Sequence, residues 1–284
     1  MNIPQLTNKI PANSQTHMDT PKISIIMGVY NGQKFLRQAI YSILNQTFRN
    51  FEFIIIDDAS TDETETILDE YSEKDERIRV IRNPQNIGLT RSLNKSLEFA
   101  RGRYIARMDA DDISLPERLD RQLAFMENNK DVGVLGTGIK IIDATGEVIK
   151  TPKLPKGNFT NYLRKKNLFV HGTLMFRKDS LDMVSGYNQE MKLAQDYELL
   201  LRLSEKVRIF CLPECLYLLR RHKQSISFAK CFTQIYYTTL AKKFFFKWKG
   251  INGEILFLKD MIYNYAIIYK CGLPFLLRLF GLIR

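Results

Sequence analysis

The stretch Tyr104-Ile-Ala-Arg-Met-Asp-Ala-Asp-Asp112 places three carboxylates directly after a short apolar run. We predict a buried strand over residues 104–108 that ends at this acidic cluster. Carboxylates packed this closely raise each other's pKa unless a cation neutralises them, and Mg²⁺ or Mn²⁺ binds both carboxylate and phosphate oxygens. A solvated acidic turn that caps the next helix has the same composition, so the surrounding sequence has to distinguish a metal site from a turn.

The residues before this stretch alternate between strand and helix patterns. Apolar runs predict strands over 23–30, 51–57 and 77–81, and helical spacing predicts helices over 33–46, 63–74 and 89–100. Such alternation is typical of an open α/β sheet with right-handed crossovers, in which ligands bind at the carboxyl ends of the strands. The polar residues expected at these ends are Tyr30, Asn31, Asp57, Asp58, Asp109 and Asp111.

The pattern changes after residue 116. We predict a helix over 117–128, a hairpin formed by 132–142 and 147–150, a strand over 168–176 and a helix over 193–204. This combination is typical of a mixed sheet with longer loops. Aromatic and basic residues then alternate over 241–249, and 255–269 is a further helix candidate.

The net charge is concentrated at the C-terminal end. The chain has 284 residues and a formal charge of +11, of which residues 230–284 carry +7 through nine Lys or Arg and two acidic residues. This asymmetry indicates a partner for the tail rather than for the body. The overall composition is that of a globular protein.

The four cysteines are Cys211, Cys215, Cys231 and Cys271. Their spacings fit no zinc pattern, which favours reduced thiols in a cytosolic protein. Residues 1–22 show no secretory signal, and no charge-free apolar run approaches the roughly 20 residues that a bilayer requires. We therefore expect a cytoplasmic protein with a flexible lead-in over residues 1–21.

A second acidic pair, Asp57 and Asp58, stands at the end of the predicted strand 51–57. Asp57 can accept hydrogen bonds from a nucleobase or a ribose, as an acidic residue does in other nucleotide-binding α/β sheets. The alternative is a cap for the following helix, which Asp58 or Ser60 could also provide. Both interpretations can hold for different residues of this segment.

Four motifs occur in order along the chain: Ile25-Ile-Met-Gly-Val-Tyr-Asn-Gly32, Ile56-Asp-Asp-Ala-Ser-Thr-Asp62, Asn86-Ile-Gly-Leu-Thr-Arg-Ser-Leu-Asn94 and Ala100-Arg-Gly-Arg-Tyr-Ile-Ala-Arg-Met-Asp-Ala-Asp-Asp112. Together they resemble the motifs of family-2 glycosyltransferases of bacterial polysaccharide biosynthesis. The resemblance covers residues 22–225 and implies the GT-A fold, a Rossmann-like α/β architecture with a mixed, mainly parallel sheet flanked by helices. It also implies a transfer that inverts the anomeric carbon.

The resemblance also implies a division of the chain. Residues 22–228 would form the GT-A domain, with a nucleotide-sugar-binding half over 22–115 and an acceptor half over 116–228. Residues 229–284 would form a basic, aromatic, helical C-terminal extension.

Each residue that matches a family motif acquires an implied role. The residues that would bind the nucleotide or the donor are Val29, Tyr30, Asp57, Asp58, Arg91, Asp109, Ala110 and Arg221. Tyr30 would stack on the base, which Asp57 would bind. Asp111 of the DXD motif would ligate a divalent metal, Mn²⁺ or Mg²⁺, at the diphosphate. Arg221 lies in a basic segment, 220–225, that can close over the diphosphate in similar enzymes.

The resemblance places the general base at Asp196. An inverting transfer needs one carboxylate to take the proton of the acceptor hydroxyl. Family members commonly have an acidic residue just before this base, whereas this chain has Gln195, so the resemblance supports the base but no second charge beside it. His171, Gly172 and Asp112 are expected on the acceptor side, and Asp112 could also contact the donor sugar or the metal.

The C-terminal segments 242–249 and 273–284 mix Lys or Arg with Phe, Trp and Leu. Two interpretations fit these segments equally well. They can lie on an anionic membrane surface, or they can form helices that pack on the body with a solvated basic face. The first alternative would place the protein peripherally on the inner face of the cell membrane. Nucleic-acid binding is not expected, because no recognisable module accompanies the basic residues.

The sequence therefore predicts an inverting glycosyltransferase that moves a sugar from a nucleotide-diphosphate sugar, with UDP as the expected nucleotide, to a glycan or lipid-linked glycan. One alternative is a nucleotidyltransferase, which would need a Gly-rich signature loop where this chain has Tyr30-Asn31-Gly32. Another is a non-catalytic, membrane-associated protein of the same fold. Such a protein would be expected to have lost Asp111 or Asp196, and both are present.

Overall fold

The first half of the chain forms a parallel sheet. The computed structural model describes residues 20–153, 157–222 and 231–248. Four strands pair in parallel in the order β3-β2-β1-β4, as the apolar runs predict: β1 (Ile23–Val29), β2 (Phe51–Asp57), β3 (Ile78–Arg82) and β4 (Tyr104–Arg107). β2 and β4 are buried along their whole length, which explains why their sequences are apolar without alternation.

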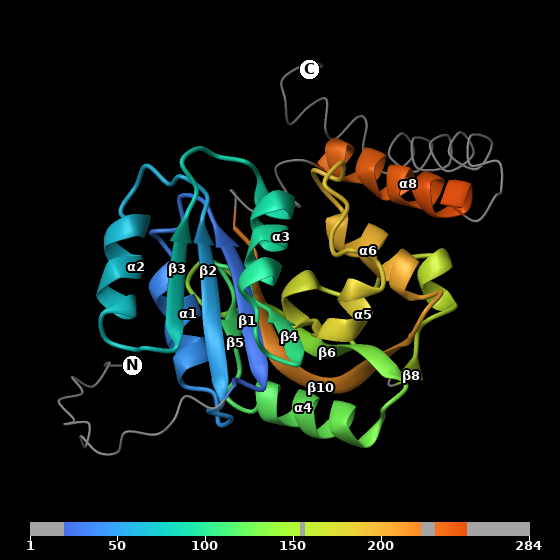
Figure 1. Cartoon of the computed structure of the whole chain (residues 1–284), viewed down its shortest axis with the longest axis horizontal. Helices are drawn as coiled ribbons and strands as arrows, with labels where there is room; N and C mark the ends of the chain where they lie inside the picture. Colours follow the sequence, from blue (N-terminus) through green and yellow to red (C-terminus); the bar gives the residue numbers. More distant parts are fainter. Residues whose placement is uncertain (1–19, 154–156, 223–230, 249–284) are drawn as a thin grey trace.

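Helices cover both faces of the sheet (Figure 1). The helices between the strands confirm the predicted ones with shorter ends: α1 (Leu36–Leu44), α2 (Thr64–Ser72) and α3 (Leu89–Phe99). One hydrophobic cluster joins α1, α2 and α4 (Arg118–Asn128) to one face of the sheet. A second cluster joins α3, α5 (Lys178–Asp182) and α6 (Gln195–Leu203) to the other face.

The second half of the chain extends the same sheet. β9 (Met175–Arg177) lies antiparallel between β4 and β6 (Val132–Ile142), and β10 (Arg208–Arg220) runs parallel to β6. Short antiparallel strands complete it: β5 (Ile113–Ser114), β7 (Val148–Lys150) and β8 (Gly157–Asn158). Because β9 is antiparallel to both of its neighbours, β6 and β10 run the same way as β1 to β4, and the predicted mixed, mainly parallel fold is confirmed.

In this half one sequence prediction is wrong and one strand was not predicted. The strand expected over 168–176 begins only at Met175, because η2 (His171–Thr173) interrupts it; η1 (Tyr162–Arg164) precedes that segment. Phe169 is buried in a loop, which accounts for the apolar run. β10 was not predicted, because Pro213 and Glu214 break its apolar pattern where its register with β6 shifts.

The order of the strands fixes the place of a ligand site. The chain adds β2 and β3 on one side of β1 and then places β4 on the other side. Such a reversal opens a crevice at the carboxyl ends of the two strands that flank it. Here these are the ends of β1 and β4, where Tyr30 and the acidic cluster lie.

Part of the C-terminal extension packs on the body. Helix α8 (Cys231–Trp248) lies against α6 (Figure 1). It buries Ala241 and Phe245 in the second hydrophobic cluster. This confirms a helical extension as far as residue 248; the helix candidate 255–269 and the segment 273–284 lie outside the described residues. Across the described ranges, no helix is long and apolar enough to cross a membrane.

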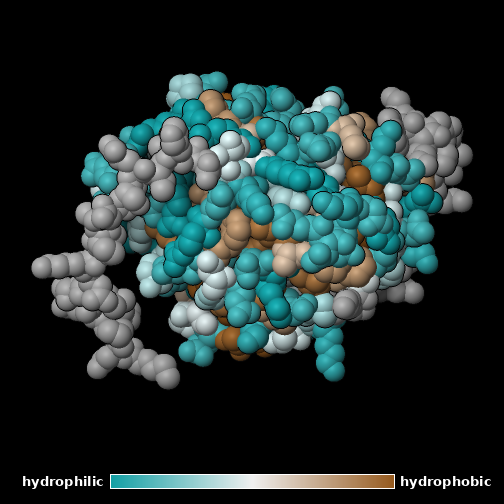
Figure 2. All heavy atoms as spheres, turned by 60° about the horizontal axis from the view of Figure 1, so that its bottom comes forward, coloured by the Kyte–Doolittle hydropathy of each residue, from teal (hydrophilic) through white to brown (hydrophobic). Residues whose placement is uncertain are grey.

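The surface is mainly polar. The face shown in Figure 2 is largely hydrophilic, with smaller hydrophobic areas between the polar side chains. The described exposed hydrophobic residues include Tyr30, Tyr41 and the β7 pair Val148 and Ile149. Of these, Tyr30 is the one at the crevice.

Residues 100–103 pack closely against the start of β1, at the edge of the sheet opposite the crevice, and a substitution can test this packing. A Cβ on Gly102 would overlap the backbone nitrogen of Ser24 and lie 2.7 Å from the carbonyl carbon of Ile23. We expect Gly102→Ala to lower the free energy of unfolding by roughly 1–3 kcal/mol, since backbone cannot yield as a side chain can. Urea denaturation would measure this, with the exposed Glu98→Ala as the control; equal stability of the two variants would contradict the packing described.

Candidate active site

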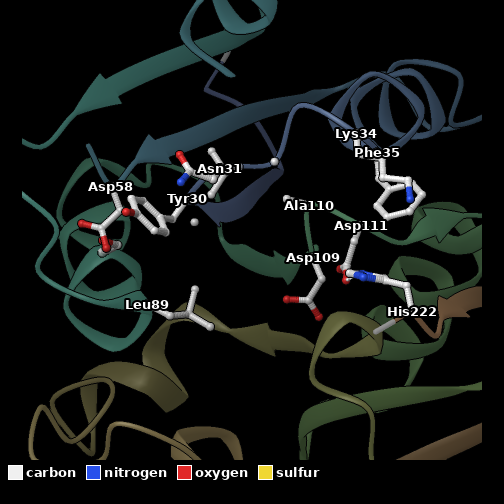
Figure 3. Close-up of a pocket in the computed structure, with 14 residues that line it drawn as sticks. Tyr30, Asn31, Lys34, Phe35, Asp58, Leu89, Asp109, Ala110, Asp111 and His222 are labelled. Carbon is white, nitrogen blue, oxygen red and sulfur yellow. Dashed lines mark hydrogen bonds and ion pairs between the residues drawn. The ribbon is translucent and has the colours of Figure 1, made fainter. Parts of the chain in front are cut away.

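A cavity of about 520 Å³ opens at the crevice (Figure 3). It is lined from the ends of β1 and β4, the starts of α1 and α3, and the end of β10. Six of the predicted donor or metal residues line it: Val29, Tyr30, Asp58, Asp109, Ala110 and Asp111. Tyr30 and Asp58 lie at one end, and Asp109, Asp111 and His222 lie at the other (Figure 3).

The turn after β1 holds Tyr30 at the cavity. Asn31 adopts the left-handed region with φ 53°, which asparagine tolerates better than most residues. Its backbone N–H donates to Ser60 Oγ at 3.0 Å, and that of Gly32 donates to Thr64 Oγ1 at 2.8 Å. The turn is thus tied to the start of α2, while the Tyr30 side chain stays 52% exposed as a flat surface beside the cavity.

The two acids after β2 have different surroundings. Asp58 accepts hydrogen bonds from the Asn83 side-chain amide at 2.8 Å, from Ile87 N at 2.9 Å and from Gly88 N at 2.8 Å. Its buried carboxylate therefore fixes the loop that leads into α3. Asp57 accepts a hydrogen bond from Ser60 N at 3.0 Å and does not line the cavity; it stabilises the turn after β2 and is not the cap of α2.

A fully buried arginine supports the acidic cluster from beneath. Arg107 Nη2 donates to Asp109 Oδ1 at 2.6 Å, and Asp109 N donates to the Tyr217 hydroxyl at 3.2 Å. Burial raises the pKa of Asp109, the charge of Arg107 lowers it, and the charge of Asp111 raises it. Asp109 is therefore oriented towards the cavity by fixed contacts on both sides.

Asp112 is turned away from the cavity. Its Oδ1 accepts the backbone N–H of Arg220 at 2.7 Å, and burial, followed by the charges of Asp111 and Asp109, raises its pKa well above the usual value. The Arg220 guanidinium donates to Asp111 O at 2.8 Å and to Gln38 Oε1 at 2.7 Å. Asp112 thus joins the acidic segment to the end of β10, and the structure does not place it on the acceptor side.

Asp111 faces a histidine that the sequence prediction did not select. His222 Nε2 lies 2.9 Å from Asp111 Oδ2, and its ring packs against Phe35 with centroids 4.9 Å apart. His222 appeared in the sequence only within the basic segment 220–225; no local pattern links it to Asp111, because β10 brings the two together. Residues 223–225 lie outside the described residues.

Asp111 and His222 suit a metal ion that takes its remaining ligands from a substrate. In the described ranges no group of three or more His, Cys, Asp or Glu is arranged to hold a metal ion. Asp111 and His222 would supply two ligands, and Mg²⁺ and similar ions take their remaining ligands from water and substrate phosphates. The residues therefore fit a divalent ion that is completed by the donor.

The basic residues predicted to bind the donor lie outside the cavity, whereas an unpredicted lysine lines it. Arg91, in the first turn of α3, and Arg221 are both exposed and do not line the cavity. Lys34 does line it, and its ammonium lies 5.1 Å from the centroid of the Phe35 ring. Gly28, Asn31, Gly32, Leu89 and Ser92 also line the cavity without having been selected as site residues.

Asp196, His171 and Gly172, predicted as the base and as acceptor-side residues, do not line the cavity. Asp196 lies in the first turn of α6, and its Oδ2 accepts a hydrogen bond from Asn167 Nδ2 at 3.0 Å. Burial raises the pKa of Asp196, and the charge of Asp109 adds to this, which places the two carboxylates in one electrostatic environment. Burial lowers the pKa of His171 well below its usual value, so the imidazole that contacts the Tyr187 hydroxyl at 2.8 Å is neutral.

Comparison with known proteins identifies the family. Residues 24–184 match the model of glycosyl transferase family 2. The chain belongs to this family. Membership of this family favours the first of the three predicted functions, a glycosyltransferase, over the nucleotidyltransferase and the non-catalytic protein.

Relatives agree with this assignment. An uncharacterized glycosyltransferase of Methanocaldococcus jannaschii is 40% identical over 65% of each chain. The O-antigen biosynthesis glycosyltransferase WbnJ of Escherichia coli is 40% identical over 72% of this chain and 81% of its own. This family 2 chain also resembles TarS of S. aureus in complex with UDP-GlcNAc, with a TM-score of 0.66 and 22% identity over 79% of this chain and 65% of that chain. The structural match confirms the GT-A fold, although the chain spans just under two thirds of the length of some relatives.

Gly172 offers a test of the close packing beneath the acidic cluster. A Cβ at this position would overlap the Tyr217 hydroxyl and lie 2.9 Å from Asp109 Oδ2. We expect Gly172→Ala to lower sugar transfer about 100-fold by displacing Asp109, since small misplacements in a site have effects of this order. Tyr217→Phe, which removes only the hydroxyl, should lose much less activity, and unchanged activity in Gly172→Ala would contradict the arrangement.

Proposed function

We propose that this glycosyltransferase transfers a sugar from a UDP-sugar to a glycan or lipid-linked glycan hydroxyl, with inversion and with the help of a divalent metal. One observation carries the proposal: a single cavity has an exposed aromatic side chain at one end and Asp109, Asp111 and His222 at the other. A base and a diphosphate require such different ends. Two TarS structures hold UDP and UDP-GlcNAc, which supports the choice of nucleotide.

The nucleotide end is suited to a base. Tyr30 presents its ring, and Val29 and Leu89 add apolar surface to the wall. Stacking on an aromatic ring does not discriminate strongly between bases, so Tyr30 supplies affinity rather than specificity. Asp58 and the backbone that it fixes would supply polar contacts at this end, and Asp57 would act on the base only through the turn that it stabilises.

The diphosphate end is suited to negative charge that grows during the reaction. Asp111 and His222 would hold Mn²⁺ or Mg²⁺, which stabilises the diphosphate as it leaves. Lys34 adds a fixed positive charge to the same wall, and Asp109 is oriented by Arg107 towards the donor sugar. We assign Arg91 and Arg221 at most a role in attracting the donor, because both are exposed outside the cavity.

The proton of the acceptor is taken by Asp196. The acceptor oxygen forms a bond to the anomeric carbon, its proton passes to the Asp196 carboxylate, and the bond from the anomeric carbon to the phosphate oxygen breaks to release the nucleoside diphosphate. Asp196 must be ionised to accept this proton. His171, Gly172 and Tyr187 would line the side from which the acceptor enters.

The name of one relative supports the choice of acceptor class. WbnJ is named for O-antigen biosynthesis, and a glycan or lipid-linked glycan acceptor is the corresponding choice here. Such an acceptor would favour work at the inner face of the cell membrane.

The function is tested with a panel of nucleotide sugars, with and without Mn²⁺. We expect metal-dependent release of UDP from one UDP-sugar and its loss in Asp196→Asn, with UDP binding retained. No metal-dependent turnover of any donor would contradict the function, and transfer that survives in Asp196→Asn would place the base elsewhere.

Tyr30 provides a test of the nucleotide end. Replacement by Ala should weaken UDP binding about tenfold or more, since stacking contributes roughly 1–3 kcal/mol per base, whereas Tyr30→Phe should bind nearly as well as the wild type. Isothermal titration with UDP would measure both. Tyr41→Ala removes a tyrosine of similar exposure, 55% against 52%, away from the cavity, and serves as the control; equal losses in Tyr30→Ala and Tyr41→Ala would contradict the assignment.

Asp111 and His222 provide a test of the metal end. We expect Asp111→Asn and His222→Ala each to raise the Mn²⁺ concentration needed for half-maximal turnover at least tenfold, because each removes one of two protein ligands. UDP binding without metal should change little. A variant with unchanged metal dependence would show that its side chain is not a ligand.

A further inference from the structure

Asp196 is held by one neighbouring side chain. Its Oδ2 accepts a hydrogen bond from Asn167 Nδ2 at 3.0 Å, and within the described ranges Asn167 supplies the side-chain hydrogen bond to this carboxylate. The residues beside Asp196 in sequence, Gln195 and Tyr197, carry no charge. The backbone N–H of Tyr197 also hydrogen-bonds to the Asp196 carboxylate, while the Tyr197 hydroxyl donates to Leu163 O at 2.7 Å.

The orientation of the Asn167 amide is fixed by its other end. Asn167 Oδ1 accepts the backbone N–H of Phe169 at 2.9 Å. Only an oxygen can accept that proton, so the NH₂ group must face Asp196. An exchange of the two ends would turn a donor towards Phe169 N–H and an acceptor towards the Asp196 carboxylate, and both hydrogen bonds would be lost.

The loop that carries Asn167 is anchored on both sides. Phe169 is buried, and its ring packs edge-on against Phe159 with centroids 5.8 Å apart. On the other side of Asn167, Leu163 is buried, and its carbonyl oxygen accepts a hydrogen bond from the Tyr197 hydroxyl of α6. The same helix, α6, thus carries Asp196 and receives the loop, so the distance between the amide and the carboxylate is set by packing.

The geometry points to a positioning role: the Asn167 amide holds one oxygen of the ionised Asp196 carboxylate and so orients the group that takes the acceptor proton. This inference rests on the proposed function. A hydrogen bond to the charged form of an acid favours ionisation, so Asn167 opposes the effect of burial on Asp196. It takes no part in bond making and acts through Asp196.

The other titratable and charged groups around Asp196 do not substitute for Asn167, and the backbone N–H of Tyr197, which also lowers the pKa of Asp196, is retained when Asn167 is replaced. Asp109, after β4, raises the pKa of Asp196 by its negative charge. The Tyr187 hydroxyl contacts His171, which is neutral because burial lowers its pKa, and burial together with the charges of Asp196 and Asp109 raises the pKa of Tyr187. Arg107, the cation whose charge acts on both His171 and Tyr187, is paired with Asp109.

Two variants separate this role from a structural one. Asn167→Asp keeps the oxygen that accepts from Phe169 N–H and replaces the amide with a second carboxylate, whereas Asn167→Ala removes both contacts. Asn161→Ala is the control, because Asn161 is exposed on the same loop and makes no side-chain hydrogen bond to the described residues. UDP binding, measured by titration, should be the same in all three variants as in the wild type.

Carbon-13 NMR of labelled aspartate, assigned with Asp196→Asn, measures the pKa of Asp196 without any need for turnover. We expect an increase of about one pH unit in Asn167→Ala, the size of a hydrogen bond to a charged group, and a larger one in Asn167→Asp. The acidic limb of kcat for UDP release from the donor found in the panel should move upward by the same amount. Activity is present above the pKa of Asp196 and is lost as the pH falls through it, so both variants should lose activity first at mildly acidic pH.

The outcomes distinguish this inference from the proposed function. An unchanged pKa of Asp196 in both variants would overturn the inference, whatever the activity. A pKa that rises while the kinetic limb stays in place would overturn it as well, because Asn167 would then not act on the reaction. A wild-type chain that turns over no donor would overturn the proposed function itself, whereas equal shifts in pKa and kinetic limb support both.

Discussion

The hydrogen bonds between Arg220 and the acidic segment are the interaction on which the site depends. The backbone of Arg220 donates to the buried carboxylate of Asp112, and its guanidinium reaches Asp111 O and Gln38. These contacts join the end of the last strand to the turn after β4 and to α1. Without these contacts, nothing would hold His222 opposite Asp111. The acidic cluster would then be a solvated acidic turn, which the same composition also allows.

The buried arginines complete this arrangement electrostatically. Arg107 and Arg118 are fully buried beneath the three carboxylates, and Arg118 donates to the carbonyls of Arg107 and Gly172. Burial lowers the pKa of Arg118 to about 10, which still leaves it protonated at neutral pH. Two buried positive charges offset part of the repulsion between Asp109, Asp111 and Asp112, and a bound divalent ion would offset the rest.

Local sequence patterns are sufficient to predict the strands and site residues of the nucleotide half, but not those of the second half. The strands up to β4 are short buried runs that end in polar residues, so the sequence alone places Tyr30, Asp58 and Asp111 at one edge of a sheet. β10 was missed because Pro213 and Glu214 interrupt its pattern, and His222 was missed with it, since the partner it meets lies 111 positions earlier in the chain. Asp57 and Asp58 could not be separated from sequence, because adjacent residues at a strand end face different surroundings. Asn167 lies in irregular backbone, where no periodicity indicates a neighbour.

The late position of β10 has a consequence for how the enzyme comes into being. A nascent chain that has reached residue 203 already contains Asp111, Asp196 and every strand of the nucleotide half. It lacks β10, which pairs with β6, β5 and β8, and it lacks His222. The strands β1 to β4 are therefore all present in the growing chain more than 100 residues before His222. Under the proposed function, a product of synthesis that stops before β10 would contain Tyr30 and the acidic cluster but not the histidine that faces Asp111.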